Sequence, residues 1–264
     1  VYYFTSAVSL GAPHRPVSFT VPTGNFGDIF AGHIAKRMGL PIGQLVIATN
    51  QNDILDRALR SGSYRMEGVH PSISPSMDIQ VSSNFERALF EAAGRDARAV
   101  TLMMEELKSG AGFTISQGIL ETLRSTFASG RASEEETSAT IRRVRETTGE
   151  LICPHTAVGV KVAEEHLSGP VPMVTLATAH PAKFPDAVEA ATGIRPALPP
   201  RMADLFEQAA GFLAFVQAFG AGHHDDRTAL VLRLDHAHMA GAFQLRAGLL
   251  DEGHVLRQIG RAHV

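Results

Sequence analysis

The sequence predicts an α/β fold with a parallel sheet and flanking helices, and three observations lead to it. Residues 17–21 and 45–49 are short apolar runs typical of buried strands. Between them, residues 29–38 carry apolar side chains at helical spacing. Residues 173–177 form another continuous apolar run. A strand, a helix and a strand over about thirty residues make one βαβ unit, whose strands run parallel.

The remaining elements expected from periodicity are mostly helices. The sequence predicts helices near residues 1–10, 84–93, 98–107, 120–130, 157–166 and 184–191. Ser133 followed by Glu136 predicts a capping box at the start of a further helix. We therefore interpret the acidic residues 134–136 as a solvent-facing helix start, and we expect no metal site there.

Composition excludes several classes of protein. The 264 residues are enough for one large domain or two small ones. The formal net charge of −3 gives no basic field for nucleic acid or an anionic membrane. One cysteine, Cys153, excludes an internal disulfide framework and fits a reducing compartment. No apolar run is long enough to span a bilayer. We therefore expect a soluble cytoplasmic enzyme.

The stretch at residues 23–28, Thr-Gly-Asn-Phe-Gly-Asp, lies between the first strand and the first long helix. Gly24 and Gly27 allow positive φ angles and a close approach of a ligand to the backbone. The free N–H groups and the dipole of the following helix favour an anion such as phosphate. A turn of this kind also occurs for packing alone. Asp28 either contacts the ligand or caps the helix.

Other polar residues stand where strands end or helices begin. Asn52 and Asp53 either edge a cleft or cap the helix from Ile54, and we favour capping. His155 and Thr156 either face a ligand or, in the case of Thr156, simply cap a helix. Thr178 stands at the carboxyl end of a strand, where α/β folds place ligands.

Four blocks of this sequence resemble the threonine synthases, which are fold-type-II, tryptophan synthase β-like enzymes that depend on pyridoxal 5'-phosphate (PLP). The blocks occupy residues 23–28, 74–87, 154–159 and 176–184, in the family's order. The resemblance covers about residues 1–206. It implies conversion of O-phospho-L-homoserine and water into L-threonine and phosphate.

The resemblance also implies a set of cofactor-binding residues. The glycine-rich loop is expected to hold the phosphate of PLP, and a threonine hydroxyl to lie against the pyridine nitrogen. Carried onto this chain, these residues are Gly24, Asn25, Phe26, Gly27, Asp28 and Thr178. Ser82, Asn84 and Arg87 lie in a family block without an assigned role. Arg87 either holds substrate phosphate or is a solvated helix charge, and we favour the latter.

PLP chemistry of this kind needs a Schiff-base lysine. None of the four lysines, Lys36, Lys108, Lys161 and Lys183, lies in the family's lysine motif. We expect that lysine upstream of Val1, so that the chain is a C-terminal fragment, inactive alone. The alternative is a non-catalytic phosphate- or nucleotide-binding α/β module. The oligomeric state stays open.

The family pattern stops at Phe206, so we divide the chain into residues 1–206, 207–258 and 259–264. The second part contains residues that could ligate a metal: His223, His224, Asp225, Asp226, His236 and His238. We favour an out-of-frame or chimeric read of a GC-rich gene instead. The last six residues resemble a translated sequencing adapter and are excluded from fold reasoning. We expect residues 207–264 to pack poorly on the rest.

Overall fold

The structure is a computed structural model that describes residues 1–110, 112–167, 169–205, 230–235 and 244–249. The chain divides into two compact units, Val1–Pro196 and Ala197–Val264. In the second unit, β7 (Leu230–Asp235) pairs antiparallel with β8 (Gln244–Leu249). The poor packing that we expect for residues 207–264 depends on side chains that the structure does not describe, and His223, His224, His236 and His238 lie outside the described residues.

A four-stranded sheet with the order β5-β2-β1-β6 forms the centre of the first unit. Its strands are β1 (Val17–Pro22), β2 (Ile42–Thr49), β5 (Phe127–Arg131) and β6 (Met173–Thr175). All neighbouring pairs are parallel. The predicted α/β class with a parallel sheet is therefore confirmed, and the carboxyl ends of the strands meet at one edge of the sheet.

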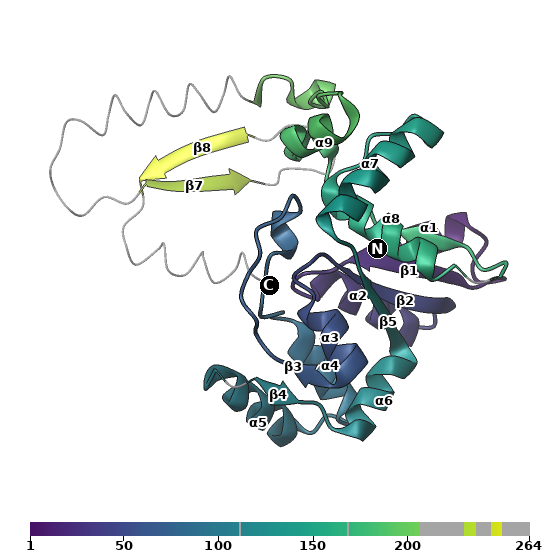
Figure 1. Ribbon diagram of the computed structural model, residues 1–264, viewed down its shortest axis with the longest axis vertical. Coiled ribbons are helices and arrows are strands. Elements are labelled where there is room, and N and C mark those ends of the chain that lie inside the picture. The colour runs from purple at the N-terminus through teal and green to yellow at the C-terminus, as the bar shows by residue number, and fades with distance from the viewer. Residues whose placement is uncertain (111, 168, 206–229, 236–243, 250–264) are drawn as a thin grey trace, which may run out of the picture. The chain divides into compact units, whose positions relative to one another are not determined.

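Helices cover both faces of this sheet (Figure 1). In chain order, the helices are α1 (Tyr2–Ser9), α2 (Gly27–Arg37), α3 (Ile54–Ser61), α4 (Phe85–Ala92), α5 (Ala97–Lys108), α6 (Gln117–Thr126), α7 (Glu134–Thr148), α8 (Pro154–Glu165) and α9 (Pro185–Thr192). The short elements are β3 (Ser63–Tyr64), β4 (Phe113–Thr114) and the 3₁₀ turns η1 (Pro75–Met77), η2 (Pro181–Lys183) and η3 (Pro200–Met202). Helices α7 and α8 lie on one side of the sheet, and α2, α3 and α4 lie on the other. None of the described helices combines the length and apolarity that a bilayer span requires.

Alternation along the strands explains this layering. Successive side chains of a strand point to opposite faces. In β2, Leu45 and Ile47 are buried in the larger apolar cluster, which includes residues of α2, α3 and α4. Val46 and Ala48 are buried against Val158 of α8 in a second cluster. Because helices cover both faces of the sheet, residues 45–48 of β2 form a continuous apolar run.

The prediction of a helix through residue 130 was wrong. Helix α6 ends at Thr126, and Phe127–Arg131 forms strand β5, which pairs with Leu45 to Thr49 of β2. The stretch Phe-Ala-Ser-Gly-Arg has no β-branched residue and no alternation, so local sequence does not indicate a strand. Its conformation comes from the backbone hydrogen bonds that β2 offers at that edge.

Helix starts gave one confirmed prediction and several corrections. Ser133 and Glu136 make the predicted capping box on α7. The capping favoured for Asp53 was wrong, and of the two alternatives for Asp28 the structure does not bear out capping, because neither side chain makes a cap hydrogen bond on its helix. Thr156 does not cap α8 either; the helix begins at Pro154, and Cys153 Sγ accepts from the Thr156 N–H group. The Asp53 carboxylate instead pairs with arginine side chains.

The closeness of α8 to the sheet gives a stability prediction. A Cβ atom at Gly159 would lie 2.7 Å from Thr175 Cγ2 and 3.1 Å from Pro22 Cγ. Gly159→Ala should therefore lower the free energy of unfolding by about 1–3 kcal/mol, because two strand residues must move. Gly118→Ala, in α6 where a Cβ meets nothing within 4 Å, is the control.

Gly118→Ala should leave stability unchanged or raise it by up to about 1 kcal/mol through helix propensity. Urea denaturation of both variants measures the difference. Equal effects of the two substitutions would contradict the packing of α8 described above.

Candidate functional site

The loop that joins β1 to α2 is anchored at both ends. The Thr23 N–H group donates to the Ala48 carbonyl of β2 at 2.8 Å. Phe26 adopts a left-handed conformation, with φ of 67°, at the N-cap position of α2. The residue is 1% exposed, and its ring makes edge contacts with the rings of Phe85 and Phe127, at centroid distances of 5.2 and 5.3 Å. Aromatic burial thus offsets a backbone conformation that is unfavourable for a non-glycine residue.

The carbonyl groups of this loop are held by the segment before α4. Ser82 Oγ–H donates to the Gly24 carbonyl at 2.7 Å. Asn84 donates twice to the Asn25 carbonyl, from its backbone N–H and from Nδ2, both at 3.0 Å. Ser82 is itself fixed, because its N–H group donates to the Tyr64 hydroxyl at 2.8 Å. These contacts give Ser82 and Asn84 the structural role that sequence reasoning left unassigned.

The N–H groups of the same loop remain available. No hydrogen bond among the described residues uses the N–H groups of Gly24 to Ile29. The first bond of the helix runs from the Phe30 N–H to the Phe26 carbonyl at 3.1 Å. Free N–H groups at a helix N-terminus carry partial positive charge, and the dipole favours an anion. This donor set fits a phosphate group.

Asp28 lies in the first turn of α2 and is held from α1. The Tyr3 hydroxyl donates to the Asp28 carbonyl at 2.8 Å and to its Oδ1 at 3.3 Å. Burial raises the pKa of the Asp28 carboxyl, and the hydrogen bond from Tyr3 opposes that rise. Asp28 as a whole residue is nevertheless exposed. Its carboxylate lies beside the loop and makes no hydrogen bond to the N–H groups of the helix.

A second segment, residues 70–80, lies against the loop and is fixed by a buried polar cluster. Asp78 Oδ1 accepts from Asn50 Nδ2 at 2.8 Å, from Asn52 Nδ2 at 2.9 Å and from the Ser72 hydroxyl. Asn52 therefore anchors this segment instead of capping α3. The Ser76 carbonyl comes so close that a Cβ at Gly24 would lie 2.8 Å from it.

His155, at the start of α8, lies on the other side of this segment. Its Nε2 accepts from the Ser76 N–H group at 3.2 Å, and its ring is 4.6 Å from that of Phe184. Burial, and to a smaller extent the charge of Lys183, lower the pKa of His155 to about 4, against the opposing effect of the Asp78 carboxylate. His155 is therefore neutral near pH 7.

Thr178 follows β6, which is the neighbour of β1 in the sheet. Thr20 is paired with Thr175, and the Leu176 N–H donates to the Thr20 carbonyl. Thr23 and Thr178 each come three residues after that pair, so both stand beyond the same edge of the sheet. Thr178 is exposed. The expected phosphate loop and the expected pyridine partner thus follow adjacent strand ends.

In the described part of the chain, no hydrogen bond or ion pair joins any of the four lysines to this loop. Lys36 and Lys108 lie in the last turns of α2 and α5. Lys161 pairs with glutamates of α7 and α8. Lys183 Nζ lies 5.5 Å from the centroid of the Phe184 ring.

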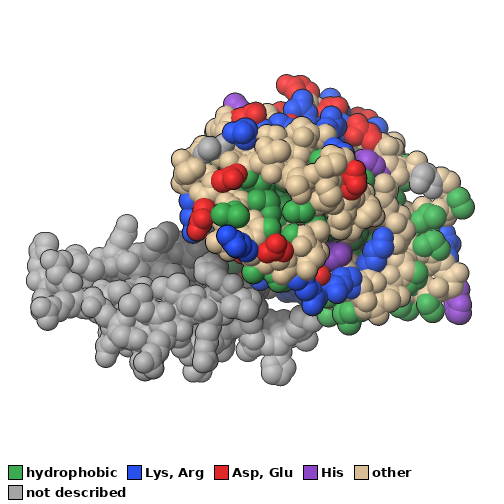
Figure 2. Space-filling view, turned by 90° about the horizontal axis from the view of Figure 1, so that it is seen from below, with side chains coloured by type: hydrophobic (Ala, Val, Ile, Leu, Met, Phe, Trp, Pro, Cys, Tyr) green, Lys and Arg blue, Asp and Glu red, His purple; other side chains and the backbone are tan. Residues whose placement is uncertain are grey.

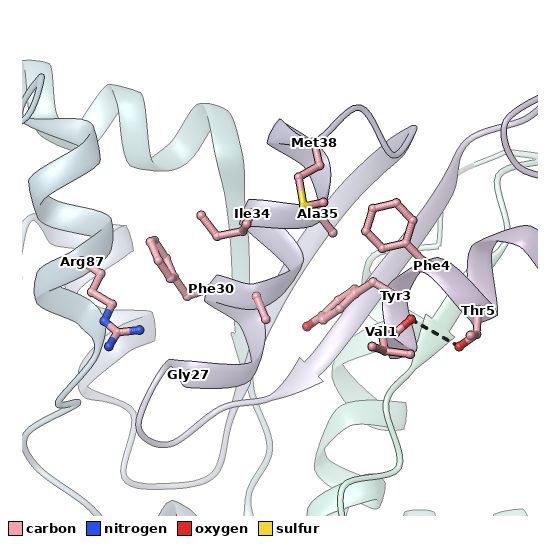
Figure 3. Close-up of a pocket in the computed structure, with 11 residues that line it drawn as sticks. Val1, Tyr3, Phe4, Thr5, Gly27, Phe30, Ile34, Ala35, Met38 and Arg87 are labelled. Carbon is pink, nitrogen blue, oxygen red and sulfur yellow. Dashed lines mark hydrogen bonds between the residues drawn. The ribbon is translucent and has the colours of Figure 1, made fainter. Parts of the chain in front are cut away.

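An open groove of about 610 Å³ runs along α2, beside the loop (Figure 3). Phe4, Phe30, Ile34 and Met38 give it an apolar lining, and Arg87 reaches its rim from α4. On the face seen in Figure 2, acidic and basic side chains of the described residues are interspersed. Recognition of an anion in the described part therefore rests on local N–H donors more than on a broad surface field.

Comparison with known proteins identifies relatives that are similar in sequence and in fold. A family model described as "Threonine synthase, C-terminal" matches residues 156–215. Threonine synthase of Pseudomonas aeruginosa is 52% identical over 231 residues, which cover 84% of this chain and 49% of that protein.

Solved structures agree with the sequence matches. PLP-bound threonine synthase from Brucella melitensis is 64% identical with a TM-score of 0.77, over 78% of this chain and 44% of that one. The yeast threonine synthase is 41% identical with a TM-score of 0.72, over 78% of this chain and 46% of that one. The chain spans about half the length of the curated relatives it matches. In sequence and in fold, the chain is thus related to the threonine synthases over about half of their length.

Proposed function

We propose that this chain supplies the phosphate-binding half of a PLP site that serves threonine synthesis from O-phospho-L-homoserine and water. One observation carries the proposal: the N–H groups of Gly24 to Ile29 have no partner among the described residues, while the loop carbonyls are occupied. The relative from Brucella melitensis is described as PLP-bound. A dianionic phosphate is the ligand class that such a donor set favours.

Each residue then has a defined task. Gly24, Asn25, Phe26 and Gly27 bind the phosphate through backbone N–H groups, and Asp28 lies beside it. The Thr178 hydroxyl hydrogen-bonds to the pyridine nitrogen and orients the ring. When bound, PLP supplies an electron sink for carbanions next to the substrate amine. The protein contributes binding and orientation, and a neutral hydroxyl partner avoids fixing a positive charge on the pyridine nitrogen.

We expect this chain to bind PLP but not to turn over substrate by itself. A Schiff-base lysine is needed for the reaction. The lysine contacts described above connect none of the four to the loop. This absence also keeps a second candidate open, a non-catalytic phosphate- or nucleotide-binding module that uses the same loop. PLP and a nucleoside monophosphate, titrated in parallel, separate the two candidates.

Calorimetric titration of the chain with PLP tests the proposal. We expect PLP and inorganic phosphate to bind and pyridoxal, which lacks the phosphate, to bind at least tenfold more weakly, since charge-assisted hydrogen bonds are lost. Gly24→Ala should weaken PLP binding about tenfold or more, because its Cβ would meet the Ser76 carbonyl. Gly27→Ala should be milder, since only Asn84 Nδ2 lies near, at 3.4 Å. Equal affinities for PLP and pyridoxal would contradict the proposal.

We expect PLP binding to require the hydrogen bonds that hold the loop carbonyls. Ser82→Ala removes the donor to the Gly24 carbonyl, so we expect a loss of about 1–3 kcal/mol in unfolding free energy and weaker PLP binding. Ser83→Ala changes an exposed neighbour and should stay within about 0.5 kcal/mol of the parent chain. Urea denaturation and PLP titration of both variants test this, and similar behaviour of the two would argue against the role of Ser82.

The pyridine contact is tested at Thr178. Thr178→Val keeps the shape but loses the hydroxyl, so PLP affinity should fall about three- to tenfold. Thr178→Ser keeps the hydroxyl and should stay within about twofold. Affinity for inorganic phosphate should not change in either variant. A drop in phosphate affinity would show that the substitution disturbs the loop rather than the pyridine end.

A further inference from the structure

We propose that His155 is a positioning residue for the phosphate loop and acts through Ser76. The inference rests on the proposed function, because it names a further residue of the same site. His155 Nε2 accepts from the Ser76 N–H group at 3.2 Å, and the Ser76 carbonyl is the atom that lies against Gly24. One hydrogen bond therefore joins α8 to the residue that limits the space at the loop.

The ring of His155 also contacts the segment that follows β6. Phe184 lies 4.6 Å from His155, at the end of the stretch that carries Thr178. His155 is 4% exposed, so its ring has little freedom to move. A single side chain thus touches both the segment over the phosphate loop and the segment that follows β6. Loss of the ring should affect both.

The hydrogen bond to Ser76 requires one protonation state. Nε2 accepts only while it carries a lone pair, so the neutral ring holds its proton on Nδ1. Nδ1 is buried and has no partner among the described residues. Two charged groups act on the ring, the cation of Lys183 and the carboxylate of Asp78. The Nδ1–H tautomer is therefore a spectroscopic signature of the contact.

The experiment compares three variants of the full chain. His155→Ala removes the acceptor, His155→Gln offers a side-chain oxygen in its place, and His166→Ala removes another histidine from the end of α8. His166 Nε2 likewise contacts a backbone group, in this case the Ser129 carbonyl at 3.2 Å, which makes it a matched control. Hydrogen exchange of the Ser76 amide is measured without ligand, and the PLP dissociation constant is then determined by titration.

We expect the Ser76 amide to exchange about tenfold faster in His155→Ala, with PLP binding weakened about tenfold, as for one lost hydrogen bond. His155→Gln should restore both to within about threefold, and His166→Ala should change neither. Nitrogen-15 spectra of the unsubstituted chain near pH 7 should show the proton on Nδ1.

Unchanged Ser76 exchange in His155→Ala, failure of His155→Gln to restore exchange, or a proton on Nε2 would overturn the inference. The tautomer measurement uses the unsubstituted chain, so it tests the role of His155 even if a variant fails to fold. If the unsubstituted chain binds no PLP, the proposed function fails, whereas Ser76 exchange and the tautomer still judge the role of His155.

Discussion

The candidate site depends on how the loop after β1 satisfies its backbone groups. Ser82 and Asn84 occupy the loop carbonyls from outside, while the N–H groups of Gly24 to Ile29 have no partner among the described residues. Buried or crowded backbone groups normally find partners, so a run of free donors beside occupied acceptors points to a ligand. The first turn of α2 adds its dipole to the same place.

The rest of the first unit keeps that loop in position. The parallel sheet places the ends of β1 and β6 side by side, and burial on both faces leaves the strands little freedom. Phe26 locks the turn among aromatic rings, and Asp78 holds residues 70–80 in a network of amide and hydroxyl donors. Removal of one donor would leave the half-buried Asp78 carboxylate with a hydrogen bond unmade, which destabilises the segment.

The sequence alone predicted those elements whose conformation depends on a local pattern of residues. Residues 17–21 and 45–49 form strands, Ser133 opens a capping box, and the turn at residues 23–28 joins a strand to a helix. Prediction from sequence failed where contacts between distant residues determine the conformation. Residues 127–131 form strand β5 through their pairing with β2. Ser82 and His155 contact residues 58 and 79 positions away, so their roles could not be read from spacing. Capping by Asn52 and Asp53 was mispredicted because Asn52 bonds to Asp78 and Asp53 pairs with arginines. At α8, Cys153 and not Thr156 occupies the N-cap position.

The assignment of this loop as a phosphate site is best tested by a nitrogen–proton correlation spectrum of the chain, titrated first with inorganic phosphate and then with PLP. We expect the amide signals of Gly24 to Ile29 to move downfield together and to saturate with one dissociation constant. Signals of α5, including its last residue Lys108, should stay in place. Movement confined to other amides, or none in the loop at saturating PLP, would contradict the assignment of this loop as the phosphate site.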